Sequence, residues 1–293
     1  MKRKIKNILA AIVYFLYEKG ILRNRIKVHT IDETIDELLH TDKSMVRFGD
    51  GEIVMIRGVD LMLQQAAPEI GEGLAGILAY QNDDLIVTIP DIFRTLSDHN
   101  QASRQFWKDH LLFNRKTYER YCNKDRVYGS TFVSRCYYFA KDRSSCDRWF
   151  AKIRKIWENK EVVIVEGTRT HNGVGNDLFD SASGIERIIC PPSNAYGALP
   201  AILDASLAYD KDRLFLLSVG VAAKFLTVEL FQRGYRVLDI GNMDMEYEWY
   251  LRNAPDKMSL EKHNIVGEEA NRQAAEQDEA YARYLEQVKV WLM

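Results

Sequence analysis

Seven short runs of apolar, mostly β-branched residues recur along the chain, and each ends at a glycine, proline, aspartate or serine. Several are continuously apolar, which is typical of strands buried on both faces of a parallel sheet. Helical stretches separate them, most regularly between about residues 160 and 245. This alternation predicts a doubly wound, mostly parallel α/β fold. The runs span residues 44–51, 85–91, 126–134, 161–168, 186–193, 213–220 and 235–242.

The helical stretches indicate how the chain is organised. Thr30 is a predicted N-cap for a helix over residues 31–40. Residues 92–125 are predicted to form a helical insertion or lid. Residues 267–292 are predicted to form a C-terminal helix, whose apolar stripe favours core packing or a dimer surface. No repeat or linker divides the chain, so we predict one domain over residues 31–293. Two more helices are predicted, over residues 200–209 and 221–234.

The first 30 residues form a separate, basic and apolar helical segment. Four basic residues precede the apolar stretch from Ile8 to Tyr17, and no small-residue cleavage site follows it. The stretch is too short to cross a bilayer, which takes about 20 residues. Two alternatives follow: a terminal helix buried on the domain, which we favour, or a segment over residues 1–25 that lies on the inner face of an anionic membrane.

Composition excludes some function classes. Lys and Arg number 40 against 42 Asp and Glu, a net charge of −2, so no overall attraction to nucleic acid is expected. The four cysteines include no CxxC pair and have no histidine at zinc spacing, which favours reduced thiols in a cytoplasmic protein. A metal ion would therefore need oxygen ligands.

The sequence VRFGDGE places two carboxylates directly after a predicted strand. Asp50 and Glu52 flank Gly51, and Arg47 lies on the strand itself. Ligands of open α/β sheets bind beyond the carboxyl ends of the strands. The turn is therefore a candidate site, although Asp-Gly is also an ordinary turn pair.

A second acidic turn, DIGNMDMEYEW, follows the last predicted strand. If it is extended, Asp244, Glu246 and Glu248 point the same way and could hold Mg²⁺ or Mn²⁺ through oxygen. If it is helical, Asp244 and Glu248 share a face and Glu246 points elsewhere. A third alternative is a solvated acidic turn whose aromatic residues pack inward.

A glycine-rich turn, EGTRTHNGVGNDLF, could bind an anion through backbone N–H groups at a helix start. It is not a dinucleotide fingerprint, because Leu178 stands where the third glycine would be, and it lacks the Gly-Lys-Ser/Thr ending of a phosphate loop. An ordinary strand-to-helix turn is equally consistent with it.

Four blocks in this order resemble the GT-D glycosyltransferases, long catalogued as a bacterial domain of unknown function. They are MVRFGDGE, YGSTFVSR, VVIVEGTRTHNGVGNDLFDSASGIERIICPPSNAYG and LLSVGVAAKFLTVELFQRGYRVLDIGNMDMEYEW, and they cover about residues 44–252. The resemblance implies a Rossmann-like fold with helices on both faces of the sheet. It also implies hexose transfer from a nucleotide sugar, typically a UDP-sugar, with a divalent cation bound by an Asp-x-Glu motif.

The resemblance assigns expected roles to residues of these blocks. Two Asp-x-Glu motifs are present, Asp50-Gly51-Glu52 and Asp244-Met245-Glu246, and either could bind the metal. We assign the metal to the second, with Asp244, Glu246 and Glu248 as ligands, and the catalytic base to Asp50 or Glu52, with Arg47 balancing phosphate charge. Relatives often have Gly-Pro-Thr-Ala in the turn after LLSVG, whereas this chain has Gly220-Val221-Ala222-Ala223, so phosphate contacts there would come from backbone N–H groups. Contacts with the nucleotide sugar are expected from Arg47, Glu166, Arg169, Gly175, Asn176, Asp177, Ser193, Asn194, Tyr196 and Gly220.

The sequence thus predicts a metal-dependent glycosyltransferase that uses Mn²⁺ or Mg²⁺ and acts in cell-surface polysaccharide or glycoprotein synthesis. Its partners would be a nucleotide sugar and a glycan or glycoprotein acceptor, and a homodimer is a further expectation. One alternative is a metal-dependent phosphohydrolase or nucleotidase, although the acid-x-acid-x-Thr pattern of aspartyl-phosphate enzymes is absent. Another is a non-catalytic protein that binds sugar nucleotides.

Overall fold

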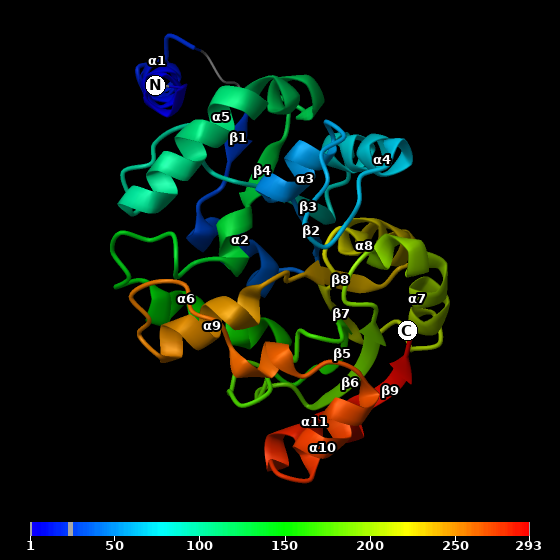
Figure 1. The fold of residues 1–293 in the computed structure, drawn as a ribbon. Coiled ribbons are helices and arrows are strands. Elements are labelled where there is room, and N and C mark those ends of the chain that lie inside the picture. Colours follow the sequence, from blue (N-terminus) through cyan, green and yellow to red (C-terminus); the bar gives the residue numbers. More distant parts are fainter. Residues whose placement is uncertain (1, 23–25, 293) are drawn as a thin grey trace.

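A computed structural model describes residues 2–22 and 26–292, and in this part of the chain nine strands form one sheet. All neighbouring strands are parallel, in the order β1-β4-β3-β2-β8-β7-β5-β6-β9 (Figure 1). The predicted parallel α/β fold is confirmed. The strands are β1 Lys27–Val28, β2 Ser44–Arg47, β3 Leu85–Ile89, β4 Val127–Ser130, β5 Glu161–Gly167, β6 Gly184–Cys190, β7 Leu214–Ser218, β8 Arg236–Asp239 and β9 Val288–Trp291.

Helices cover both faces of the sheet. In Figure 1, α2, α6 and α9 lie on one side, and α4, α7 and α8 lie on the other. The helices are α1 Lys2–Glu18, α2 Ile31–His40, α3 Asp50–Met55, α4 Pro68–Ala79, α5 Gln101–Tyr121, α6 Cys146–Arg154, α7 Leu199–Ser206, α8 Ala222–Gln232, α9 Met243–Leu251, α10 Glu268–Ala275 and α11 Glu279–Gln287. Short 3-10 helices span Thr131–Ser134, Lys155–Trp157, Ala195–Ala198 and Glu261–Asn264.

The two-sided burial of the strands explains their continuous apolar sequences. In β5, Val162 and Ile164 pack into the core under α2 and α6, whereas Val163 and Val165 pack against α7 and α8. All four side chains are fully buried. Because successive side chains of a strand point to opposite faces, a strand between two helical layers needs apolar residues at every position.

The predicted start of α2, with Thr30 as its N-cap, is confirmed. The Thr30 hydroxyl accepts a hydrogen bond from the Glu33 backbone N–H, and the Glu33 carboxylate accepts one from the Thr30 backbone N–H. This capping box satisfies two backbone donors that the first turn leaves unpaired. The helix begins where the sequence predicted.

The C-terminal tail differs from its prediction. Residues 267–292 form α10, α11 and the edge strand β9 instead of one helix. Asp278 interrupts the helix and restarts it, because its carboxylate accepts the backbone N–H of Ala280 as an N-cap. The β-branched stretch from Val288 then pairs with β6, which extends the sheet.

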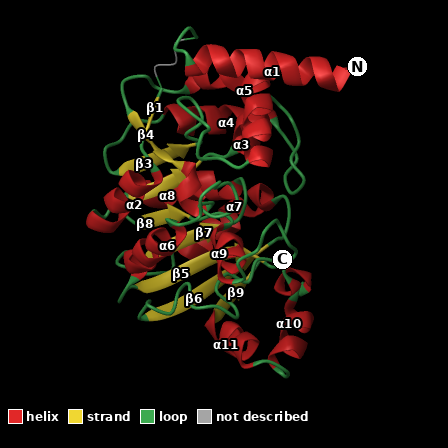
Figure 2. Cartoon of the chain, turned by 90° about the vertical axis from the view of Figure 1, so that its left-hand side faces the viewer, coloured by secondary structure: helices red, strands yellow, loops and turns green. Residues whose placement is uncertain are grey.

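The N-terminal helix α1 lies along α5 at one end of the molecule (Figure 2). The Tyr17 hydroxyl donates to the Glu119 carboxylate at 2.8 Å, and the Lys6 ammonium lies 2.6 Å from the Asp109 carboxylate. Only one face of α1 packs on the domain, through Ala10, Tyr14 and Tyr17, and the other face is exposed. Across the part of the chain that the structure describes, no helix combines the length and apolar character needed to cross a membrane.

Candidate active site

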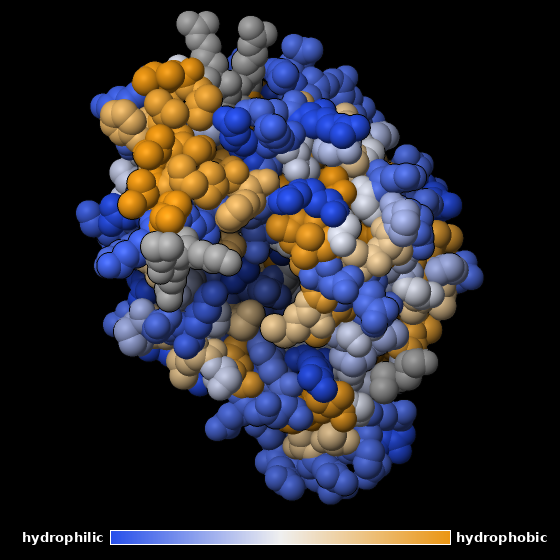
Figure 3. Space-filling model, turned by 45° about the horizontal axis from the view of Figure 1, so that its top comes forward, coloured by the Kyte–Doolittle hydropathy of each residue, from blue (hydrophilic) through white to orange (hydrophobic). Residues whose placement is uncertain are grey.

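A cavity of about 690 Å³ lies at the carboxyl ends of the strands. Its walls come from the segments that follow β2, β4, β6, β7 and β8 and from the first turns of α5. Carboxyl ends of parallel strands meet at one edge of the sheet, which is why segments far apart in sequence converge here. Figure 3 shows a hollow near the middle of this face. Polar lining residues include Arg47, Asp50, Glu52, Thr131, Arg135, Ser193, Ser218, Lys224, Asn242, Glu246 and Lys257.

Glu52 is held in a buried charge cluster at the cavity floor. The Lys224 ammonium lies 2.9 Å from the Glu52 carboxylate and 3.0 Å from the Asp239 carboxylate. The second oxygen of Glu52 accepts the Gly49 backbone N–H at 2.7 Å. Burial opposes ionisation, but Lys224 and Arg47 lower the pKa of Glu52 below its ordinary value. Glu52 is therefore a fixed anion with its oxygens already engaged.

Asp50 differs from Glu52 although it lies two residues away. It lines the cavity, and it takes part in no ion pair among the described residues. Burial, and then the neighbouring negative charge of Glu52, raise the pKa of Asp50 above its ordinary value. Of the two carboxylates predicted as the base, Asp50 is the one whose environment favours accepting a proton.

Arg47 crosses the floor of the cavity from the end of β2. Its side chain passes so close to Gly241 that a Cβ there would overlap the guanidinium group. Its Nη1 lies 3.5 Å from the Thr131 hydroxyl, and its buried Nε has no hydrogen-bond partner among the described residues. A buried guanidinium N–H without a partner is a donor available to a ligand.

Glu246 also lines the cavity, from α9. One oxygen accepts the backbone N–H groups of Tyr137 and Tyr138, at 3.0 and 2.8 Å. The other lies 3.5 Å from the Arg135 guanidinium. Burial nevertheless raises the pKa of Glu246 above its ordinary value. Glu246 thus orients the segment that carries Arg135 into the cavity.

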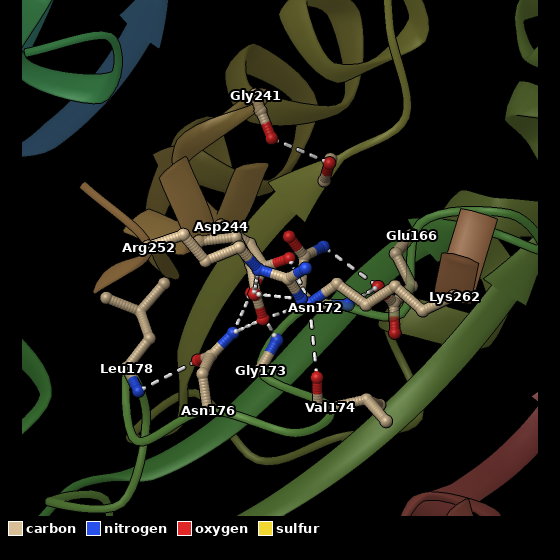
Figure 4. A network of polar contacts seen from close by, with 12 residues as sticks. Glu166, Asn172, Gly173, Val174, Asn176, Leu178, Gly241, Asp244, Arg252 and Lys262 are labelled. Atoms are coloured by element: carbon tan, nitrogen blue, oxygen red, sulfur yellow. Dashed lines mark hydrogen bonds and ion pairs between the residues drawn. The ribbon is translucent and has the colours of Figure 1, made fainter. Parts of the chain in front are cut away.

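Asp244 and Glu248 lie on another face of α9, away from Glu246. The helical alternative for this segment is the one that the structure adopts. The Lys262 ammonium lies 2.7 Å from Asp244 and 3.2 Å from Glu248, and Asn176 donates to both carboxylates at 2.8 Å (Figure 4). Burial opposes ionisation of Glu248, but Asn176 and Lys262 lower its pKa.

The three acids assigned to the metal therefore do not form one ligand set. Lys262 occupies the position between Asp244 and Glu248 that a cation would take. Within residues 2–22 and 26–292, no group of three or more His, Cys, Asp or Glu side chains is placed to hold a metal ion. The predicted set does not fit a divalent cation, which takes six or more oxygen ligands, several of them from the protein.

Much of the glycine-rich turn lies outside the cavity. Glu166 is fully buried, 2.5 Å from the Arg187 guanidinium, and accepts the Asn172 backbone N–H. Asp177 accepts the Tyr247 hydroxyl at 2.6 Å, which ties the turn to α9. Arg169 is exposed and, like Gly175, is not part of the cavity wall. Gly167 and Thr170 are the members of this block that line it.

The block after β6 contributes Ser193 to the cavity and supports a neighbouring loop. The Asn194 backbone N–H donates to the Leu63 carbonyl at 2.7 Å, and its side chain accepts the Gln65 N–H at 2.9 Å. The Tyr196 N–H donates to the Gln64 side chain at 3.3 Å. Asn194 and Tyr196 thus hold the loop over residues 61–64, which forms part of the wall. Gly220, with φ +59°, lines the cavity before α8.

Sequence reasoning missed several residues of the cavity. Arg135 ends the block YGSTFVSR and follows β4. A position just after a parallel strand is the signal that could have placed it at the cavity. Lys224 and Lys257 had no comparable signal. The apolar wall from α5 and the loop over residues 61–64 was also missed; it includes Leu61, Met62, Leu63, Phe106, Trp107, Phe132 and Phe139.

Comparison with known proteins identifies the fold family. The family model described as the glycosyltransferase GT-D fold matches residues 45–268. The chain belongs to the GT-D glycosyltransferase family. The resemblance predicted from the four sequence blocks is thereby confirmed.

Relatives and solved structures agree with this membership. The chain is 41% identical over 237 residues to a probable glycosyl transferase, Gly, from Streptococcus gordonii, a match over 80% of this chain and 35% of that protein. It is 40% identical over 236 residues to the glycosyltransferase GlyD from Streptococcus pneumoniae serotype 4, over 80% and 29% of the two chains. The GT-D chain thus spans about a third of the length of these curated relatives.

Two solved structures superpose over nearly the whole GT-D chain. One is a highly conserved domain of unknown function with a distinct glycosyltransferase fold, 33% identical, with a TM-score of 0.83 over 96% of this chain and 98% of that one. The other is a glycosyltransferase from Streptococcus sanguinis, 37% identical, with a TM-score of 0.82 over 92% and 100% of the two chains.

Proposed function

We propose that this GT-D protein transfers a hexose from a nucleoside diphosphate sugar, of which a UDP-sugar is the leading candidate, to a hydroxyl group of a glycan acceptor. The observation that carries the proposal is the cavity at the strand ends, which Asp50 lines together with Arg47, Arg135 and Lys257; the positive charges of Arg135 and Arg47 act on the Asp50 carboxylate. Cations suit a diphosphate, and a carboxylate with a raised pKa suits proton transfer.

The diphosphate would lie against Arg47 and Arg135. Lys224 contributes less, because Glu52 and Asp239 already neutralise its charge. Gly220 and Val221 of the cavity wall lead into α8, an 11-residue helix whose first backbone N–H groups are suited to bind an anion. Negative charge that develops on the leaving nucleoside diphosphate would be stabilised by these groups.

Asp50 is the proposed base for the acceptor hydroxyl. A raised pKa brings the carboxylate closer to neutral pH, where a general base is most effective. Glu52 would keep Lys224 and the start of α3 in place through its ion pair and its bond to Gly49. Its role in this proposal is therefore positioning.

Dependence on Mn²⁺ or Mg²⁺ stays a prediction of the family resemblance. Asp244, Glu246 and Glu248 do not fit as one ligand set for such an ion. The acceptor, in cell-surface polysaccharide or glycoprotein synthesis, and the homodimer also stay predictions.

Release of UDP from UDP-hexoses, measured with and without glycan acceptors, tests this function. We expect Asp50→Asn to lower turnover by about 100-fold or more, as loss of a general base does. Arg169→Gln is the matched control, because Arg169 is exposed outside the cavity wall, and it should keep full activity. Release of phosphate from simple phosphomonoesters, with no sugar transfer, would instead support the phosphohydrolase alternative.

A further inference from the structure

The helix α1 is apolar on the face that it turns to solvent as well as on the face that packs on the protein. Ala10, Tyr14 and Tyr17 face the protein and are at most 6% exposed. The opposite face consists of apolar side chains that are each 49–59% exposed: Ile5, Ile8, Leu9, Ile12 and Phe15. A helix that only packed on the domain would have polar side chains on its outward face.

The exposed face is continuous and large. Residues spaced three and four apart lie on one face of a helix, so Ile5, Ile8, Leu9 and Ile12 form one stripe. The exposed ring of Phe113 on α5 is a further apolar group beside α1, where it lines a groove together with Val13 and Leu16. Figure 3 shows an apolar area over this end of the molecule, on the same side as the hollow of the candidate active site.

Basic residues flank this apolar stripe. The sequence of α1 has four basic residues in its first five positions and a single acid, Glu18, at its end. Lys4 on α1, Lys19 in the turn that follows it and Lys116 on α5 are exposed, and none of them is ion-paired to an acid in the described part of the chain. The protein as a whole has a net charge of −2, so this positive charge is local.

We propose that the outward face of α1 docks on an anionic lipid bilayer, with the helix lying in the plane of the interface. Apolar side chains flanked by lysines match such a surface, because the apolar stripe enters the acyl boundary while the lysines meet anionic headgroups.

The charge pattern disfavours a second copy of this chain as the occupant. A two-fold interface brings the same patch of both subunits together. It would therefore set the basic start of one α1 close to that of the other, and like charges in apposition oppose association. Anionic lipid complements both the apolar and the basic parts of the surface.

Co-sedimentation of the full chain with lipid vesicles tests the proposal. We expect binding to vesicles of phosphatidylcholine with phosphatidylglycerol, and much weaker binding to phosphatidylcholine alone. Raising the salt from 0.1 to 1 M should weaken it, because the Debye length falls from about 10 to about 3 Å. The double variant Ile8→Gln/Ile12→Gln should bind at least about tenfold more weakly, because it removes apolar area from the stripe.

The matched control is Leu251→Gln, which changes an equally exposed apolar residue on α9. It should bind vesicles like the wild type. Both variants should keep the wild-type melting temperature and nucleotide-sugar binding, so a failure here is distinct from a failure of the proposed transferase function. Unchanged binding of the double variant, or no vesicle binding by the wild type, would overturn the proposal. So would a dimer in light scattering that the double variant dissociates, which would assign the face to a second copy.

Discussion

The Lys262 ammonium lies 2.7 Å from the Asp244 carboxylate, in the position that the sequence assigned to a metal ion. Lys262 also approaches Glu248 and donates to the Val174 carbonyl, and it is 7% exposed. This one side chain joins the segment after α9, the glycine-rich turn and α9 itself. Asp244 and Glu248 thus form a buried ion-pair cluster with Lys262, which connects three segments beside the cavity and which we call the Lys262 junction.

Replacing Lys262 tests this junction. Lys262→Met leaves Asp244 and Glu248 buried without a cation, so we expect the free energy of unfolding to fall by about 3–5 kcal/mol. Urea denaturation measures it. Lys289→Met, which removes an exposed lysine, is the control and should change stability by less than about 0.5 kcal/mol. Equal effects of both variants would contradict the junction.

Asp50→Asn should separate binding from chemistry. The variant keeps the shape of the side chain, so nucleotide-sugar affinity should remain close to that of the wild type while turnover is lost. In the wild type, the rate should fall as the pH is lowered through the raised pKa of Asp50, because the base must be ionised. A pH–rate profile checks the prediction. If the residual rate of Asp50→Asn still falls at low pH, another group is responsible for the pH dependence.

The same raised pKa has a consequence for stability. The folded state disfavours the ionised form of Asp50, so it binds the proton more tightly than the unfolded chain does. The stability that Asp50 provides is therefore greatest at low pH, below its unfolded pKa, and decreases as the pH rises through the folded value. We expect Asp50→Asn to raise the melting temperature at pH 7 more than at pH 4, measured by calorimetry. A larger effect at pH 4 would contradict the direction of the shift.

Gly241→Ala tests the close approach of Arg47. Gly241 has φ +49°, and a Cβ there would overlap the Arg47 guanidinium group. We expect a loss of at least about 1 kcal/mol in unfolding free energy, together with weaker nucleotide binding. Gly76→Ala is the control, because Gly76 lies on an exposed face of α4 with open space around its Cα, and it should be neutral or slightly stabilising. Unchanged nucleotide affinity in Gly241→Ala would argue against a role for Arg47 in binding.

The sequence was sufficient to predict the sheet because its seven central strands are mostly apolar, and β2, β3 and β7 are buried at every position. It failed at the edges, where β1 and β9 are short, partly exposed and without an apolar run. Asp50 and Arg47 were predicted at the cavity because any residue after a parallel strand lies at the same sheet edge.

The metal assignment failed to form one site for a physical reason. Spacing of two residues fits an extended strand and spacing of four fits a helix, and the acids 244, 246 and 248 satisfy both patterns. Only tertiary contacts decide which conformation forms and what neutralises the acids. Here the neutralising group is Lys262, which lies in a segment whose sequence has no periodic pattern to predict its position. Arg135 and Lys257 likewise come to the same cavity as Asp50 only in the folded chain.

The most direct test of the central claim compares UDP-hexoses, UDP and uridine by thermal stabilisation, in wild type and in Arg135→Gln, with Mn²⁺ and with EDTA. We expect a UDP-hexose at about 100 times its dissociation constant to stabilise the wild type by about 2.7 kcal/mol. Arg135→Gln should weaken UDP and UDP-hexose binding at least about tenfold but leave uridine binding unchanged, because Arg135 would contact the diphosphate. Absence of stabilisation by every nucleotide sugar tried, under both conditions, would contradict it.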